Sequence, residues 1–270
     1  MDKNAVISRI RDIVSYHYNS WKNKYLKYTA LSYAKRHNLY DKACQEIASY
    51  TKEDIDTVRQ KQKGWAGLKG KTRIFDEQKN LTSAKIEDFY KGYEYYLYEL
   101  PLWNAEQGRS YYLWSILEPH IISNGYKHIL DYGGGSGDLA IELVSRGLEV
   151  DYLDINEILY DFVAYRMKAR NIKFGLFKRI EDTKKMYDCI VSFDVFEHLK
   201  GLPQYLSKIS EAVKKDGGLV FSGAFSGGSL HLLENEIYSN FQKLDRLIAS
   251  CGFVYSHKFA QYYFYKKIYG

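Results

Sequence analysis

Apolar positions up to about residue 127 recur every three or four residues, which is the spacing of amphipathic helices. The spacing is carried by Val6, Ile10, Ile13, Val14, Tyr25, Tyr28 and Leu31. A capping-box pattern at Thr51 and Asp54 predicts the start of a further helix with Ile55 and Val58 on its buried side. We also expect one helix from Ser83 that stops before Pro101 and another from near Arg109 toward Pro119, closed by Asn124-Gly125. Residues 1–108 are therefore predicted to form an all-helical N-terminal region.

After residue 127 the pattern changes to short apolar runs separated by helical stretches, which is typical of a parallel sheet wound with helices. The predicted strands are 128–131, 149–155, 172–177, 188–193 and 218–223, and the predicted helices are 138–145, 157–169 and 203–213. Together they indicate a doubly wound α/β fold.

The C-terminal tail differs from this alternation. A helix over 234–249 is followed by two strands, 253–259 and 262–269, joined too tightly for a crossover helix. They must pair antiparallel, which adds a reversed strand to an otherwise parallel sheet. We therefore predict a Rossmann-like, mostly parallel seven-stranded sheet with an antiparallel last strand, in a domain over residues 109–270.

Composition narrows the class of protein. With 270 residues, 46% apolar and 27% charged, the chain is long and hydrophobic enough to bury a core. Its three cysteines are odd in number and share no C-x-x-C spacing, which argues against disulfides or a zinc knuckle. With no run of 18 apolar residues and no signal-like N-terminus, we expect a cytoplasmic protein that does not span a membrane.

The positive charge lies in the first half of the chain. Residues 1–127 hold 21 Lys and Arg against 15 Asp and Glu, within a net charge of +6 for the chain. An acid-free basic run comprises Arg59, Lys61, Lys63, Lys69, Lys71 and Arg73 around the glycines of GWAGLKG. Such runs usually form solvated connectors, and we expect a flexible join over 61–82. The alternative is an anion-binding segment that would hold a nucleic acid.

The segment HILDYGGGSGD, residues 128–138, leads an apolar strand directly into a glycine-rich turn that opens a helix. Gly133, Gly135 and Gly137 permit positive φ and a close approach of the backbone to a ligand. Asp154 closes the second strand, where an acid commonly accepts hydrogen bonds from ribose hydroxyls. The combination predicts a site for a nucleoside-containing ligand.

Two ligand classes fit the glycines. Gly135, Gly137 and Ala140 also satisfy the dinucleotide pattern G-x-G-x-x-[GA], so the loop alone admits NAD(P). Asp131 precedes the glycines, however, and its charge would face a pyrophosphate at close range. A cationic ligand is favoured in such a cleft, and S-adenosylmethionine carries both an ammonium and a sulfonium.

These residues resemble the class I S-adenosylmethionine-dependent methyltransferases. Residues 131–137, DYGGGSG, are similar to the family's D-x-G-x-G-x-G loop, and 187–199, YDCIVSFDVFEHL, to its fourth-strand segment. Residues 214–220, KKDGGLV, resemble the turn before its fifth strand, and the reversed last strand agrees with the family fold. The resemblance covers residues 109–270.

The resemblance implies roles for individual residues. Asp131 with Gly133, Gly135 and Gly137 would hold the methionine part of S-adenosylmethionine, and Asp154 its ribose. Ile155 would pack on the adenine, while Phe193 and Asp194 would lie beside the methionine end. Family members often place an acid after the third strand on the adenine amine, and here Glu181 or Asp182 stands near that position, out of register.

Methyl transfer is an in-line displacement in which alignment supplies much of the acceleration, and a base helps when the acceptor must lose a proton. His198 and His231 follow the fourth and fifth strands, and both are candidate bases. Asp194, Glu197 and His198 stand at i, i+3 and i+4, a spacing suited to a divalent cation. Because many members carry the same string without a metal, we predict none.

We therefore predict an enzyme that methylates a small-molecule acceptor on oxygen or nitrogen, with the N-terminal helices as a lid. Aromatic residues before the sheet would line that lid or pack between helices: Tyr90, Tyr93, Tyr95, Tyr96, Tyr98, Trp103, Tyr111 and Tyr112. The alternatives are an RNA or protein methyltransferase that uses the basic run, and a catalytically silent nucleoside-binding protein.

Overall fold

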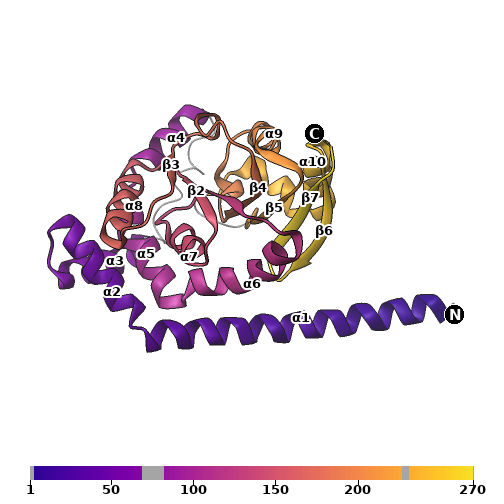
Figure 1. Cartoon of the computed structure of the whole chain (residues 1–270), viewed down its shortest axis with the longest axis horizontal. Coiled ribbons are helices and arrows are strands. Elements are labelled where there is room, and N and C mark those ends of the chain that lie inside the picture. The colour runs from indigo at the N-terminus through magenta and orange to yellow at the C-terminus, as the bar shows by residue number, and fades with distance from the viewer. Residues whose placement is uncertain (1–2, 69–81, 227–230, 270) are drawn as a thin grey trace.

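The computed structural model describes residues 3–68, 82–226 and 231–269, and its centre is one seven-stranded sheet (Figure 1). The strands are β1 (His128–Tyr132), β2 (Glu149–Leu153), β3 (Gly175–Phe177), β4 (Tyr187–Phe193), β5 (Val213–Ser222), β6 (Phe253–Phe259) and β7 (Tyr262–Lys267). They lie in the order β3-β2-β1-β4-β5-β7-β6, and β7 pairs antiparallel with both β5 and β6. The predicted fold class is confirmed.

Helices cover both faces of this sheet. One face packs on α6 (Arg109–Asn124), α7 (Asp138–Ser145) and α8 (Glu157–Arg170). The other packs on α9 (Leu202–Ala212), α10 (Phe241–Ser250) and the short 3₁₀ turns η1 (Ile180–Asp182) and η2 (Phe196–His198). Side chains alternate between the two cores along each strand, so that Ile129 faces the first and Leu130 the second. The buried strands of this sheet therefore read as continuous apolar runs.

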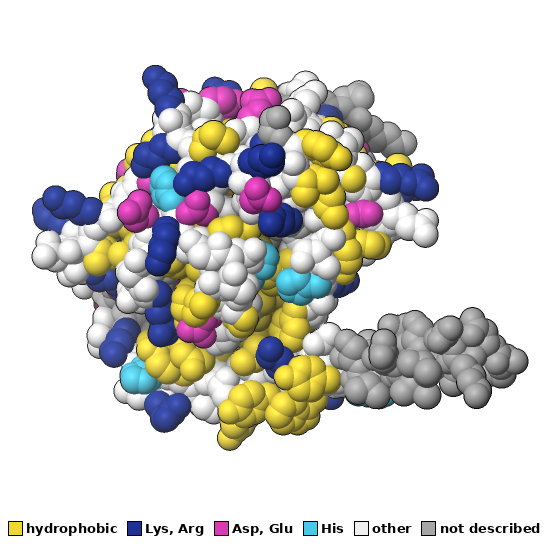
Figure 2. Space-filling view, turned by 45° about the vertical axis from the view of Figure 1, so that its right-hand side comes forward, with side chains coloured by type: hydrophobic (Ala, Val, Ile, Leu, Met, Phe, Trp, Pro, Cys, Tyr) yellow, Lys and Arg dark blue, Asp and Glu magenta, His cyan; other side chains and the backbone are white. Residues whose placement is uncertain are grey.

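The N-terminal helices wrap one side of this body. They are α1 (Lys3–Arg36), α2 (Leu39–Thr51), α3 (Ile55–Leu68), α4 (Ser83–Lys91) and α5 (Tyr96–Gln107). The C-terminal part of α1 runs beside α6, and its N-terminal part projects past the body (Figure 1). Figure 2 shows hydrophobic side chains at the foot of this projection, where Tyr18, Trp21, Tyr25 and Tyr28 of α1 are exposed.

Gly108 separates α5 from α6 and adopts a φ of +59°. A Cβ at this position would collide with the backbone of Ala30 in α1, so three helices meet at backbone distance there. The domain boundary that we predict lies at this residue.

Several predicted boundaries in the helical region were wrong. The single helix expected before Pro101 is two helices, broken at Gly92, and Pro101 lies inside α5. Pro119 likewise lies inside α6, which ends at Gly125 as expected. Thr51 ends α2, and it is Asp54 whose carboxylate accepts a hydrogen bond from Thr57 N at the start of α3.

Two further boundaries need correction or fall outside the described residues. Residues 61–68, expected in a flexible join, continue helix α3, while 69–81 lie outside the described residues. The helix expected over 234–249 is a 3₁₀ segment, η3 (Leu233–Ser239), followed by α10, because Asn240 caps α10 through its side chain.

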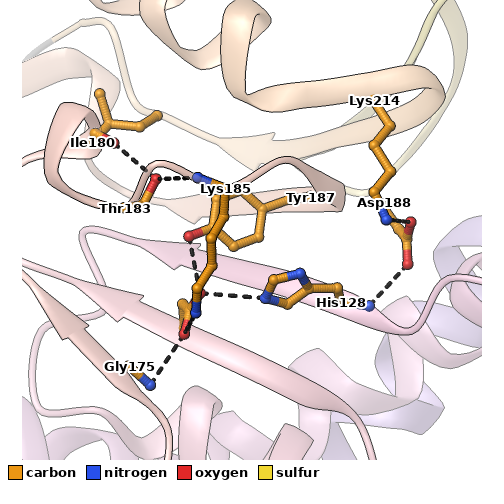
Figure 3. A network of polar contacts seen from close by, with 9 residues as sticks. His128, Gly175, Ile180, Thr183, Lys185, Tyr187, Asp188 and Lys214 are labelled. Carbon is orange, nitrogen blue, oxygen red and sulfur yellow. Dashed lines mark hydrogen bonds and ion pairs between the residues drawn. The ribbon is translucent and has the colours of Figure 1, made fainter.

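A polar network ties β1, β2 and β3 to the segment before β4 (Figure 3). Its centre is the buried carboxylate of Asp151, which accepts hydrogen bonds from Lys185 Nζ (2.8 Å), Tyr187 Oη (3.0 Å) and Gly175 N (3.0 Å). His128 Nε2 lies 3.2 Å from the same carboxylate. Burial alone would raise the pKa of Asp151, but the hydrogen bonds from Lys185 and Tyr187 outweigh it and lower the pKa.

Candidate active site

The glycine-rich turn between β1 and α7 has the backbone that its sequence predicts. Gly133, Gly135 and Gly137 have φ values of +72°, +54° and +74°. A Cβ at Gly133 would collide with Val195, so here the close approach of two loops, and not only the positive φ, requires glycine. The turn leaves the first N–H groups of α7 at the edge of a cleft, where they can meet an anionic group.

Asp131 lies at the base of this turn, with its carboxylate buried. Its Oδ2 atom has no hydrogen-bond partner among the described residues. Burial, together with the nearby charge of Asp154, raises the pKa of Asp131 to about 7. A buried acceptor without a partner is costly, so a cationic donor in the cleft would relieve it.

Asp154 ends β2 on the opposite side of the turn. Its carboxylate accepts hydrogen bonds from Gly135 N (2.8 Å) and Asn156 N (2.9 Å), which fix its orientation toward the cleft. Burial raises its pKa as well. Ile155 follows on the cleft wall.

The N-terminal helices hold the turn from outside. Arg166 of α8 is buried and donates to Ser136 O (2.5 Å), Asp138 (2.8 Å) and Glu46 of α2 (3.1 Å). Asn104 of α5 donates to Ser136 Oγ and to Asp138. Sequence reasoning missed both residues, because no local pattern marks a contact between helices so far apart in the chain.

A cavity of about 520 Å³ opens at the carboxyl ends of β1, β2 and β4, where ligands bind in doubly wound sheets. All eight residues predicted to bind the cofactor lie on or beside it, and Asp131, Gly133, Gly135, Asp154, Ile155, Phe193 and Asp194 line it. The eighth, Gly137, caps α7 directly behind the turn. The structure therefore gathers residues that the sequence spreads over three strand ends.

Helix α4 covers this cavity. Asn156 donates through Nδ2 to Tyr90 O (2.7 Å) and Tyr93 O (3.2 Å), which ties the end of α4 to the end of β2. From the predicted aromatic cluster, Tyr90, Tyr96 and Trp103 line the cavity. Tyr98 instead packs in the core of the N-terminal helices, Tyr112 packs in the core on one face of the sheet, and Tyr111 stacks on Tyr33 of α1.

Arg109 lies at the opening of the cavity, at the start of α6. Its guanidinium contacts Asp194 Oδ2 at 2.5 Å and lies 4.7 Å from the ring centre of Trp103. Asp194, which has a φ of +59°, also accepts a hydrogen bond from Ser222 Oγ at 2.9 Å. Arg109 is a further candidate site residue, and nothing in the local sequence marks it as one.

His198 and His231 approach one another at the far end of the cavity. Their ring centres are 5.1 Å apart, and His198 Nδ1 lies 2.9 Å from Tyr90 Oη. Burial and the neighbouring His198 lower the pKa of His231. Of the two imidazoles, His198 is the one that lines the cavity.

The acid expected near the adenine is also on the cavity wall. Glu181 lines the cavity and forms an ion pair with Lys208 at 2.5 Å, whereas Asp182 is not among the lining residues. The hydrogen bond from Lys208 lowers the pKa of Glu181 and keeps it charged.

A family model described as a methyltransferase domain matches residues 91–248, which is more than half of the chain. The chain belongs to this family. The resemblance to class I S-adenosylmethionine-dependent methyltransferases is thereby confirmed, and the matched segment begins within the N-terminal helices, at the end of α4.

The alignments with curated relatives cover only part of each protein. A Rickettsia akari (strain Hartford) protein named ubiquinone biosynthesis O-methyltransferase is 28% identical over 97 residues, 35% of this chain and 39% of that protein. A Geobacillus sp. (strain WCH70) protein that carries a methyltransferase name is 27% identical over 135 residues, 47% of this chain and 54% of that protein. The chain therefore matches about half or less of these relatives.

One solved structure has the same fold. Magnesium protoporphyrin IX methyltransferase from Synechocystis PCC 6803, with bound S-adenosylmethionine, superposes with a TM-score of 0.51 at 14% identity and covers 70% of this chain and 99% of that one. At this identity the likeness shows the fold alone. Among the described residues, no helix is long and apolar enough to cross a bilayer.

Proposed function

We propose that this protein transfers a methyl group from S-adenosylmethionine to an oxygen or nitrogen of a small molecule. The observation that carries the proposal is the unpartnered, buried carboxylate oxygen of Asp131 beside the glycine turn. An ammonium supplies the missing donor and a compensating charge, whereas a pyrophosphate would meet a carboxylate at close range. The Asp131 carboxylate therefore favours S-adenosylmethionine over a nicotinamide dinucleotide.

Each cofactor-binding residue has a chemical role in this proposal. Asp131 and the turn at Gly133, Gly135 and Gly137 bind the methionine part, and Asp154 accepts hydrogen bonds from the ribose. Ile155 packs on the adenine, and Phe193 and Asp194 border the methionine end. Arg109, held by Asp194, is placed to attract the methionine carboxylate.

The chemistry requires few further groups. The acceptor forms a bond to the methyl carbon as the carbon–sulfur bond breaks, and the electron pair of that bond remains on sulfur as S-adenosylhomocysteine. The acceptor loses its proton to a base, for which we propose His231 or His198. The low pKa of His231 keeps its imidazole neutral and able to accept a proton at neutral pH.

We further propose that residues 1–108 form the lid and the acceptor-binding surface, in front of the catalytic domain over 109–270. Tyr90, Tyr96 and Trp103 give the cavity aromatic walls that suit a flat acceptor. The names of the relatives point to small-molecule pathways as well. A cytoplasmic location fits the three free cysteines.

A nucleic-acid acceptor is less favoured. The structure describes Arg59, Lys61 and Lys63 of the basic run. Arg59 contacts Asp41 and Asp56, and Lys61 contacts Glu53, so these two cations are already paired. Lys69, Lys71 and Arg73 lie outside the described residues.

Calorimetric titration of the full chain tests the proposal. We expect S-adenosylmethionine and S-adenosylhomocysteine to bind in the micromolar range and NADH not to bind. Asp131→Ala should weaken both sulfur nucleosides, because it removes the buried carboxylate. Binding of NADH with no binding of S-adenosylmethionine would overturn the proposed function.

A further inference from the structure

Three potential metal ligands meet where β4 and β5 end. Glu197, His198 and His231 each offer a ligand atom, and these atoms lie within 4.8 Å of one another. Glu197 and His198 come from η2, directly after β4, and His231 comes from the loop after β5. The adjacency of the two strands brings together residues that the sequence separates.

The carboxylate of Glu197 is buried, and one of its two oxygens has no hydrogen-bond partner among the described residues. The residue is 1% exposed, and its Oε1 accepts a hydrogen bond from Ala224 N at 2.9 Å. Its Oε2 and the Nδ1 atom of His231 are both buried without a partner among the described residues. A buried carboxylate oxygen and a buried imidazole nitrogen without partners are each costly, and a cation bound by both would remove that cost.

Asp194 does not belong to this cluster. Its two carboxylate oxygens contact Arg109 and Ser222, which draws the side chain toward the methionine end of the cavity. The spacing of Asp194, Glu197 and His198 suggested three ligands on one helical face. The turn is instead a short 3₁₀ segment, and His231 takes the third place.

Surrounding contacts hold the three ligands in place. Tyr90 Oη lies 2.9 Å from His198 Nδ1 and would orient that ring toward a bound ion. Leu232 N donates to Glu197 O at 3.1 Å, which fastens the His231 loop to the Glu197 turn. Supporting hydrogen bonds of this type orient the first ligands in most metal sites.

We propose that Glu197, His198 and His231 form a site for a first-row divalent transition metal, with zinc as the reference ion. Two imidazole nitrogens and one carboxylate oxygen are a donor set that suits zinc and its neighbours, and hard cations such as magnesium prefer oxygen ligands. With metal–ligand distances of about 2.0–2.2 Å, ligand atoms around a tetrahedral ion lie roughly 3.5 Å apart, so the cluster would contract from its separations of up to 4.8 Å on binding. Three protein ligands leave a coordination position open.

The site would serve the acceptor side of the proposed reaction, and this part of the inference rests on the proposed function. His198 lines the cavity, so a cation bound there would lie next to an acceptor hydroxyl and favour its deprotonation. His198 and His231 would then act as ligands and not as free bases. A chelator would lower the turnover of a metal-assisted reaction and leave one that depends on an imidazole base unchanged.

Titration of the metal-free full chain with Zn²⁺, and with Co²⁺ followed by visible absorption, tests the site. We expect one equivalent of each ion to bind and the Co²⁺ complex to show d–d bands. His231→Asn and Glu197→Gln should each weaken Zn²⁺ binding at least about tenfold. His257→Asn, at an exposed histidine that stacks on Phe264, is the matched control and should bind Zn²⁺ as the unaltered chain does.

Binding of S-adenosylmethionine, measured on the same samples, keeps the outcomes distinct. Zn²⁺ binding that is absent, or unchanged in both variants, overturns the metal site, and intact S-adenosylmethionine binding then leaves the proposed function standing. Zn²⁺ binding that depends on these residues without any S-adenosylmethionine binding supports the site and contradicts the proposed function. His231→Asn leaves the buried carboxylate in place, so it reports on the site even if Glu197→Gln fails to fold.

Discussion

The sheet region and the N-terminal helices contribute to the cavity in different ways. The sheet supplies Asp131, Asp154 and Phe193 at strand ends, where the backbone itself sets their positions. The helices supply Tyr90 and Trp103 through packing and through long-range hydrogen bonds. The proposed cofactor end of the site is therefore determined by local sequence, whereas the proposed acceptor end depends on contacts between distant segments.

The two regions are nevertheless joined at the glycine turn. Arg166 and Asn104 connect it to α2 and α5, so the N-terminal helices, which we propose to shape the acceptor end, also hold the turn. Replacing these contacts separates the two contributions.

The largest effect is expected at Arg166. Arg166→Met removes a buried guanidinium and takes one charged partner from each of the carboxylates of Glu46 and Asp138, which should lower the free energy of unfolding by about 3–5 kcal/mol. Urea denaturation measures the change. Arg170→Met is the control, because Arg170 contacts the same Glu46 from a more exposed position and should cost below about 1 kcal/mol. Equal losses in both variants would contradict the role of Arg166.

Asp154 should dominate cofactor affinity without a comparable effect on folding. Asp154→Ala removes the proposed ribose acceptor, worth about 1.5–3 kcal/mol, so affinity for S-adenosylmethionine should fall roughly 10- to 150-fold in calorimetry. Asp161→Ala, at an exposed acid of α8, should leave the affinity unchanged. An unaltered dissociation constant for the Asp154 variant would remove Asp154 from the site.

Cofactor affinity should depend on pH through Asp131. Its pKa of about 7 in the free protein means that the carboxyl is protonated below that pH and then cannot attract an ammonium. Affinity should therefore fall by up to about tenfold for each pH unit below 7 and level off above it. Titrations at several pH values measure the slope. Asp131→Asn should flatten it, and a slope that survives this substitution would assign the dependence to another group.

Replacement of Asn104 should have the smallest effect on the affinity for S-adenosylmethionine. Asn104→Ala removes the neutral hydrogen bond to Ser136 and the one to Asp138, and we expect affinity for S-adenosylmethionine to fall roughly 2- to 10-fold, from about 0.5–1.5 kcal/mol. Gln107→Ala, at an exposed position of the same helix, is the control. If both variants bind equally well, α5 covers the turn without supporting it.

The sequence predicted the sheet because its strands are bounded by clear changes of pattern. The predicted strand 253–259 and the predicted helix 138–145 have the same bounds as β6 and α7, and the tight 259–262 connection was enough to predict the reversed β7. The glycine turn was equally predictable, since positive φ at three alternate positions leaves little choice of residue. Local rules therefore suffice where the backbone determines the outcome.

Other parts of the site could not be predicted from local pattern. Arg166 occupies a helix whose other charges are on the surface, and the acceptors that compensate its burial, Glu46 and Asp138, come from other elements. The sequence marks Arg109 only as the first residue of a helix, and its place at the cavity becomes evident from its ion pair with Asp194. The apolar spacing runs on across Gly92 and hides the stop signal that a glycine after the basic Lys91 provides. In the structure, α4 ends there and Asn156 fastens its end over the cavity.

The crossing at Gly108 limits how this protein can be recombined. Because α1 touches the backbone of that residue and also runs along α6, a chimaera cut at 108/109 would divide one packing unit. A chimaera made to exchange acceptor specificity between related chains would have to transfer the whole segment from the N-terminus to Asn124, the end of α6, in one piece. Selection for new acceptors would meet the same constraint, and we expect it to favour point changes on α4 over wholesale replacement of the front helices.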